Sequence, residues 1–425
     1  MVCIRVWDGR ARSAAARGVD GAEPARERSG LKTCLVHNFY LQHGGEEQAF
    51  ATESSMLEAH GHRVFRYTIH NDRIKELNPL KLACCTLWNR TIAHELLRII
   101  RKVRPDVIHF HNTFPLISPS AYYAAKAEGV PVVQTLHNYR LLCPNALFFR
   151  NGHICEDCMG KFVPWPGILH ACYRESRAAA TVAVVMLSLH RVLRTYSQIV
   201  DVYIALTEFA RNKFIEGGLP AEKFVIKPNF IDTDKFREYS GRSTCRYALF
   251  VGRLSPEKGI ETLLEAWKHI GERLPLKIVG DGPMACELED QLTSRAGIEW
   301  MGATHREEVI ACMKQAELLV FPSVCIEGFG TTMVEAFAAG LPVIASRHGA
   351  MAEIVEDGRT GLHFESGNPK DLAAKVEWAW THPKEMEAMG REARKEYERK
   401  YTAEINYKML IDIYETAIER ARMKK

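Results

Sequence analysis

Two junctions between a strand and a helix, both in the second half of the chain, carry residues suited to binding a phosphate. The first junction runs from Val251 to Gly259 and is followed by a helical pattern over residues 260–270. The N-terminus of a helix has unpaired N–H groups and a partial positive charge, so it attracts phosphate. Arg253 offers a bidentate fork and Lys258 a point charge, and together they could clamp a diphosphate. The alternative, which would be commoner for a lone cation, is a solvated loop.

The second junction, Glu327 to Glu335, follows a predicted strand over residues 318–321. Gly328 and Gly330 allow close approach of a ligand to the backbone and leave N–H groups available. Glu327 lies in the loop and Glu335 about two turns into the helix, where carboxylates can hydrogen-bond the hydroxyls of a sugar or a ribose. The alternative is an ordinary helix start with two surface glutamates.

The order of these features along the chain resembles that of family 4 glycosyltransferases. The motifs are Val-Gly-Arg-Leu-x-x-x-Lys-Gly from Val251, Val-Gly-Asp-Gly-Pro from Val279 and Glu-x7-Glu from Glu327. The resemblance extends from about residue 31 to the C-terminus and is clearer in the second half. It implies an α/β protein with the GT-B fold, in which two Rossmann-like, doubly wound parallel-sheet domains face a cleft. It also implies a nucleotide-diphosphate-sugar donor and retention of the anomeric configuration.

The resemblance also assigns roles to individual residues. Arg253 and Lys258 would bind the donor diphosphate, Glu335 the ribose hydroxyls and Glu327 the transferred sugar. Other donor-binding positions would be Gly280 and Gly282, Trp300 to Gly302 at the nucleotide end, and Gly328, Phe329, Gly330 and Thr331. The family implies no catalytic metal or other cofactor, because the two cations and a helix N-terminus stabilise the departing diphosphate. No residue stands out as a covalent nucleophile.

The first half of the chain adds a glycine pair and a histidine. Gly44 and Gly45 match the family's glycine turn beneath the donor phosphates, although a lone pair of glycines is usually a simple turn. His137 matches the family's histidine at the end of a strand facing the cleft, where an imidazole could bond a sugar hydroxyl or polarise the reacting centre. Many members have Asp where this chain has Asn138, which leaves the role of the histidine open.

Two further histidines, His109 and His111, alternate on one predicted strand and therefore share a face. We expect at least His111 to line the acceptor side of the cleft.

Four of the twelve cysteines lie within thirty residues, at Cys143, Cys155, Cys158 and Cys172. The Cys-x2-Cys turn and four thiolates suit tetrahedral Zn²⁺, which would stabilise a loop with little core of its own. The alternatives are free thiols packed in the loop and an iron–sulfur cluster. We predict a structural zinc, with no part in catalysis.

Alternating strand-like and helix-like segments predict two successive parallel sheets wrapped by helices. The expected strands cover residues 33–37, 107–110, 132–136, 202–206, 224–226, 247–251, 276–279, 298–301, 318–321 and 343–345, and the last forty or so residues are expected to be helical. The expected parts are an extension outside the fold (1–30), an acceptor domain (31–230) with a cysteine-rich insert (143–172), a donor domain (240–400) and a C-terminal helix packing back on the first domain (401–425). The linker is placed between Pro228 and Ser243, where the periodicity lapses.

Composition limits the classes of protein that remain. With 425 residues, a net charge of +4 and a pI near 8.4, the chain suits an enzyme that handles anionic phosphates and lacks the dense basic patches of a nucleic-acid binder. No apolar run approaches the ~18 residues of a membrane span, and no signal-peptide pattern is present, so we expect reduced cysteines and a cytoplasmic location. The basic and apolar stretch Arg174–Arg194 is also compatible with peripheral contact at the inner membrane face, although a core helix is the commoner meaning of such a pattern.

These observations predict a retaining hexosyltransferase of cell-surface polysaccharide biosynthesis that transfers a sugar to a glycan or lipid-linked acceptor. Two alternatives remain on the same fold. One is a nucleotide-sugar epimerase or sugar-phosphate synthase, and the other is a non-catalytic scaffold that binds nucleotides or glycans. A scaffold would not need Arg253, Lys258, Glu327 and Glu335 together.

Overall fold

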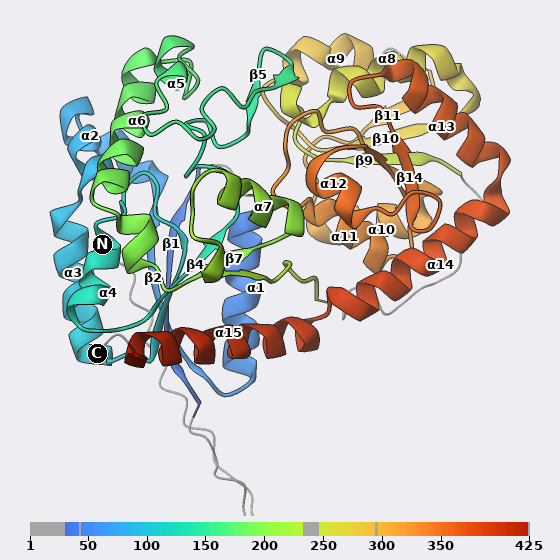
Figure 1. Ribbon diagram of the computed structural model, residues 1–425. Coiled ribbons are helices and arrows are strands. Elements are labelled where there is room, and N and C mark those ends of the chain that lie inside the picture. The colour runs from blue at the N-terminus through green and yellow to red at the C-terminus, as the bar shows by residue number, and fades with distance from the viewer. Residues whose placement is uncertain (1–29, 42–43, 233–245, 294–295, 424–425) are drawn as a thin grey trace, which may run out of the picture. The chain divides into compact units, whose positions relative to one another are not determined.

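The computed structural model describes residues 30–41, 44–232, 246–293 and 296–423 (Figure 1). All but the last residue of the predicted N-terminal extension, and most of the predicted linker, lie outside these ranges. Within them the chain forms two six-stranded sheets with helices between successive strands, which confirms the predicted α/β class.

The first sheet has the strand order β2-β1-β3-β4-β7-β8. Its strands are β1 (Lys32–Phe39), β2 (Arg63–His70), β3 (Val107–Asn112), β4 (Val132–Leu136), β7 (Val202–Ala205) and β8 (Phe224–Ile226). β3, β4 and β7 are buried along their whole length, as expected for central strands of a parallel sheet that helices cover on both faces.

The second sheet has the order β11-β10-β9-β12-β13-β14, and its strand pairs are parallel. Its strands are β9 (Ala248–Val251), β10 (Leu276–Val279), β11 (Ile298–Trp300), β12 (Leu318–Phe321), β13 (Val343–Ser346) and β14 (Gly361–Phe364). Numbered from one, this is the Rossmann order 3-2-1-4-5-6, so the direction of winding reverses between β9 and β12. Ligands of such sheets bind beyond the carboxyl ends of the two strands at that switch point.

Side-chain alternation along the second sheet builds two separate cores. Leu249 and Leu319 belong to the core on one face, whereas Ala248, Phe250 and Leu318 belong to the core on the other. The strands β9, β10, β12 and β13 are each four residues long and apolar at almost every position, because both faces of the sheet are covered there.

Most helices connect successive strands, and several begin at a side-chain cap. They are α1 (Gly45–Ala59), α2 (Pro79–Leu87), α3 (Arg90–Val103), α4 (Ala121–Ala127), α5 (Pro166–Leu169), α6 (Arg177–Val192), α7 (Glu208–Glu216), α8 (Ile260–Ile270), α9 (Ala285–Thr293), α10 (Arg306–Gln315), α11 (Thr331–Ala338), α12 (Gly349–Ile354), α13 (Pro369–Thr381), α14 (Pro383–Lys400) and α15 (Ala403–Met423). At α13, the side chain of Asn368 accepts hydrogen bonds from the N–H groups of Lys370 and Asp371, and Pro369 occupies the first helical position. No helix in the described part of the chain is both long and apolar enough to cross a membrane.

Every predicted strand is present in the structure, but the sequence patterns missed two edge strands and a small hairpin. β2 carries Arg63, Arg66 and Thr68 at the edge of the first sheet, so it lacks the apolar run that marked the central strands. β14 is four residues long, and the hairpin of β5 (Phe149–Arg150) and β6 (His153–Ile154) pairs only two residues on each side. The C-terminal residues are helical as predicted, in two helices that are interrupted at Tyr401.

The chain divides into two compact units. Among the described residues, one unit comprises those up to Thr135, Gln198–Val202 and those from Tyr414 onward, and the other comprises Leu136–Ser197 and those between Tyr203 and Ile413. The second unit therefore contains the whole second sheet together with the cysteine-rich insert and α6.

Helix α8 directly follows the loop that carries Arg253 and Lys258. A substitution in its buried face tests how much the packing of this helix contributes to stability. Leu263 is fully buried in the core that α8 shares with the second sheet. We expect Leu263→Ala to lower the free energy of unfolding by about 2–5 kcal/mol, because the substitution leaves a cavity. Chemical unfolding should show this loss, whereas the exposed Glu261→Ala in the same helix should stay within about 0.5 kcal/mol of the wild type.

Candidate active site

The loops that follow β9 and β12 touch at the switch point of the second sheet. Gly259 has φ of +71°, and a Cβ at this position would lie 2.0 Å from the carbonyl oxygen of Pro322. The backbone N–H of Val324 also donates to the carbonyl of Glu257 at 3.0 Å. Glycine is therefore required at position 259, both for its conformation and for the close approach of the second loop.

An ion pair joins these two loops. The ammonium of Lys258 lies 2.6 Å from Oε1 of Glu327, and the hydroxyl of Ser323 donates to the same oxygen at 2.5 Å. Burial is the largest single influence on both groups and opposes both charges, but the ion pair, its hydrogen bonds and the neighbouring groups together outweigh it. The pKa of Lys258 is therefore raised above its usual value, and the pKa of Glu327 is lowered. Sequence reasoning had placed the two residues in one site without predicting that they pair.

The loop that contains Glu327 and Gly328 approaches the backbone just after β4. A Cβ on Gly328 would lie 2.6 Å from the backbone carbonyl oxygen of His137. The hydroxyl of Tyr139, a buried residue that sequence reasoning missed, donates to the backbone carbonyl of Glu327 at 3.2 Å. The half-buried His137 is thus brought next to the predicted sugar-binding loop.

Two more glycines hold the loop after β10 against the loop after β9. A Cβ on Gly280 would lie 1.9 Å from the carbonyl oxygen of Gly252, and one on Gly282 would lie 2.3 Å from that of Leu254. The indole N–H of Trp300 donates to the carbonyl of Gly280 at 2.9 Å. Together with the loop after β12, these two loops form one closely packed backbone cluster at the carboxyl edge of the second sheet.

The start of α11 places the backbone of Gly330 and Thr331 next to the buried side chain of Phe329. Gly330 caps this helix with φ of +85°, and Thr331 is its first residue. Phe329 points into the core, with its ring centroid 6.0 Å from that of Tyr401. Phe329 therefore anchors the loop and can offer a ligand only its backbone.

Glu335, two turns along from Glu327, pairs with an arginine that sequence reasoning missed. The guanidinium of Arg306, the first residue of α10, lies 2.9 Å from the Glu335 carboxylate. The carboxylate is only 13% exposed, so the ion pair fixes its orientation.

Arg253 is exposed and forms no ion pair with any residue in the described ranges. Its guanidinium is therefore available to an anion, in contrast to Lys258, whose charge is already balanced by Glu327.

His348, just before α12, is a second residue that the patterns did not reveal. Its Nε2 lies 2.8 Å from the carbonyl oxygen of Cys325, which can only accept, so Nε2 carries the proton. The remaining nitrogen, Nδ1, is buried and has no hydrogen-bond partner among the described residues. Burial lowers the pKa of His348, which favours the neutral ring, although the Cys325 carbonyl and Glu327 act in the opposite direction.

The glycine pair predicted beneath the phosphates belongs to the other unit. Gly44 precedes α1 and Gly45 is the first residue of that helix. The N–H of Gly44 donates to the side chain of Glu47 at 2.8 Å, which is one of the two hydrogen bonds of a capping box.

His109 and His111 share a face as expected, with ring centroids 4.3 Å apart, but both are buried. His109 contacts the hydroxyls of Tyr414 at 2.9 Å and Thr135 at 2.7 Å, and Oε1 of Glu53 lies 3.1 Å from His109 and 3.3 Å from His111. His111 is 3% exposed, so the structure places it in an internal polar cluster and not on an open surface.

The zinc prediction for Cys143, Cys155, Cys158 and Cys172 receives no support from the geometry. Cys143 and Cys158 instead act as thiol donors, to Oδ1 of Asn145 at 2.9 Å and to the carbonyl of Pro164 at 3.7 Å. Burial, together with the neighbouring cysteines, raises the pKa of Cys158 to about 12. In the described ranges, three ligand atoms within 4.8 Å of one another are found in Glu53, His109 and His111 and in His37, Glu46 and Glu47, but not in these cysteines.

Comparisons with known proteins place the chain in a family. Residues 43–235 match the family described as Glycosyltransferase Family 4, and residues 232–396 match the family described as Glycosyl transferases group 1. The uncharacterized glycosyltransferase MJ1607 of Methanocaldococcus jannaschii is 32% identical over 386 residues, which are 85% of this chain and 92% of that protein. The chain is a family 4 glycosyltransferase.

Two further proteins match this glycosyltransferase over different shares of its length. The uncharacterized glycosyltransferase MJ1178 of the same organism is 36% identical over 160 residues, which are 37% of this chain and 44% of that protein. The crystal structure of Anabaena HepE in complex with UDP matches with a TM-score of 0.63 and 18% identity, over 90% of this chain and 99% of that one. The predicted GT-B fold is confirmed.

Substitution of Glu327 tests the ion pair at the centre of the site. We expect Glu327→Gln to cost about 1–3 kcal/mol of stability at neutral pH, because the charge of Lys258 loses its partner. Since the pKa of Glu327 in the folded state lies below its usual value of 4.5, the stabilisation is present above that pH and is lost as the pH falls through the folded-state pKa. Thermal unfolding against pH should therefore show the difference between variant and wild type shrinking on acidification. Glu287→Gln, an exposed change in α9, is the control, and a difference independent of pH would contradict the assignment.

Proposed function

We propose that this enzyme transfers a sugar, with retention of configuration, from a nucleotide-diphosphate sugar to a glycan or lipid-linked acceptor in cell-surface polysaccharide assembly. The observation that carries the proposal is the position of the Lys258–Glu327 pair at the switch point of the second sheet, with Arg253 exposed in the same loop. This is the position at which an open α/β sheet binds a nucleotide ligand.

The donor diphosphate would lie over the loop after β9. Arg253 would bind it with a bidentate fork, and Lys258 would add a positive charge that Glu327 holds in place. The first turn of α11 would contribute backbone N–H groups, and Glu335, oriented by Arg306, would accept hydrogen bonds from the ribose hydroxyls. HepE is described in complex with UDP, which makes a uridine nucleotide the first donor to test.

The transferred sugar would lie beside the adjoining Glu327 loop and His137. Glu327 and His137 would bond its hydroxyls. In the reaction, the acceptor oxygen bonds to the anomeric carbon on the face from which the diphosphate departs. The bond from that carbon to the phosphate oxygen breaks, and the acceptor proton passes to the departing phosphate. The cations stabilise the negative charge that develops on the leaving group.

Ligand-dependent stability tests the donor site. A ligand that binds only the folded protein at ~100 times its Kd stabilises by about 2.7 kcal/mol, so thermal unfolding with UDP-, GDP-, ADP- and TDP-sugars should identify the donor. We expect Arg253→Ala and Lys258→Ala to abolish most of the shift, and Lys268→Ala, an exposed change in α8, to keep it. Equal shifts in all four proteins would place the nucleotide elsewhere, and the absence of any shift would favour a non-catalytic scaffold.

The stereochemistry of the product tests the retaining mechanism. With an α-linked nucleotide sugar as donor, we expect the NMR coupling of the anomeric proton in the first-formed product to report an α-linkage. His137→Ala should lower kcat by about 10²-fold while preserving the donor-induced thermal shift, because it removes a group that contacts only the sugar. A β-linked product would contradict retention, and release of an isomerised nucleotide sugar without an acceptor would indicate an epimerase.

A further inference from the structure

Helix α6 exposes a stripe without charge, which is unusual for a helix that faces water. Residues 178–189 of this helix contain no Asp, Glu, Lys, Arg or His, and the next residue, His190, is buried. Val185 and Val192, seven residues apart and so on one side of the helix, are 43% and 64% exposed. A solvated helix normally presents polar residues on its outer side, so this stripe is suited to being covered.

The segment before α6 adds larger exposed apolar side chains. Phe162 is 58% exposed, Trp165 is 54% and Leu169 is 52%, and Val163 lies between them at 44%. Of the thirteen exposed large apolar side chains in the described ranges, nine lie between Leu147 and Leu193. Scattered single residues of this kind are normal on a surface, but their concentration in one segment is not.

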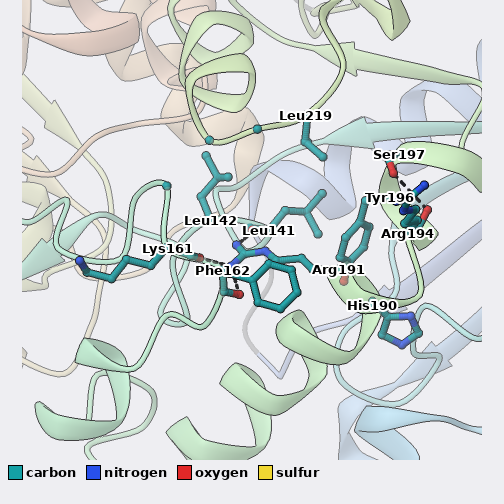
Figure 2. Close-up of a pocket in the computed structure, with 13 residues that line it drawn as sticks. Leu141, Leu142, Lys161, Phe162, His190, Arg191, Arg194, Tyr196, Ser197 and Leu219 are labelled. Atoms are coloured by element: carbon teal, nitrogen blue, oxygen red, sulfur yellow. Dashed lines mark hydrogen bonds between the residues drawn. The ribbon is translucent and has the colours of Figure 1, made fainter.

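Arg191 holds these two elements together. Its guanidinium donates to the carbonyls of Lys161 at 2.5 Å and Phe162 at 2.9 Å, and to that of Leu141 at 2.8 Å (Figure 2). The backbone of Phe162 is thereby attached to the last turn of α6. We call the surface of Phe162, Val163, Trp165, Leu169, Val185 and Val192 the insert face.

The charges in the segment that carries most of the insert face are almost all positive. Residues 161–194 contain five Lys or Arg and a single acidic residue, Glu175, which is a net charge of +4 and equals the formal net charge of the whole chain. Arg177 begins the uncharged stripe of α6, while Arg191 and Arg194 lie at its end. A cavity of about 270 Å³ opens beside Lys161, Phe162 and Arg194 (Figure 2). Anionic groups would therefore be attracted to the rim of an apolar surface.

We propose that the insert face is the surface by which this enzyme docks on an anionic lipid bilayer. Aromatic and aliphatic side chains would enter the boundary between headgroups and acyl chains, and the surrounding basic residues would bind lipid phosphates. A second copy of the chain is a poorer occupant, because its insert face would bring a further charge of +4 against the first. The inference deepens the proposed function, on which it rests for the lipid-linked acceptor, but docking itself requires no turnover.

Vesicle binding by the full chain tests the proposal. We expect the protein to sediment with phosphatidylcholine vesicles that contain phosphatidylglycerol, to bind pure phosphatidylcholine more weakly, and to dissociate at high salt. Val185→Glu with Val192→Glu should lower partitioning by about tenfold or more, since two anionic side chains would enter the interface. Leu80→Glu is the matched control, because Leu80 is 81% exposed in α2 and should leave binding unchanged.

A spectroscopic measurement covers the case in which the double variant folds poorly. Lipids brominated near the headgroup should quench tryptophan fluorescence of the wild type, and Trp165→Phe should remove most of that quenching while vesicle binding persists. Equal binding by wild type and double variant, or unchanged quenching in Trp165→Phe, would overturn the proposal. Absence of wild-type binding, with a dimer that the double variant dissociates, would make the insert face a protein interface. Donor-induced thermal shifts, measured separately, show whether the proposed function itself has failed.

Discussion

The ion pair between Lys258 and Glu327 is the interaction on which the candidate site depends. It links the loops after β9 and β12, the two strands between which the winding of the second sheet reverses. Because both side chains are largely buried, neither charge is well solvated alone, so each loop needs the other in place. The pair thus couples the position of Lys258, the proposed phosphate-binding cation, to the position of Glu327, the proposed sugar-binding carboxylate.

Close backbone approach is the second constraint around the site. Gly259, Gly280 and Gly328 each lie so near a neighbouring carbonyl oxygen that a Cβ would be at 2.6 Å or less. Side chains are excluded there, so the loops after β9, β10 and β12 and the end of β4 pack backbone against backbone. This leaves little conformational freedom in the loops and allows the charged groups to be held at fixed distances without a ligand.

Burial decided the roles that residue type alone left open. Phe329 lies in the donor-binding motif, yet its ring is part of the core. His109 and His111 have the chemistry of a binding site and form an internal polar cluster instead. The four cysteines of the insert have a chelating spacing, but spacing along the chain does not specify whether the loop folds its thiols inward together or separately.

The sequence by itself determined the α/β class, the central strands and the two motifs at the switch point, because local periodicity and turn chemistry do not depend on distant residues. It also indicated which positively charged residues could bind a phosphate. Only the tertiary structure decided that Arg306 orients Glu335, that Tyr139 holds the backbone of Glu327 and that α6 keeps an apolar stripe exposed. These features join residues far apart in the chain, and the patterns of neighbouring residues contain no information about which distant segments will meet.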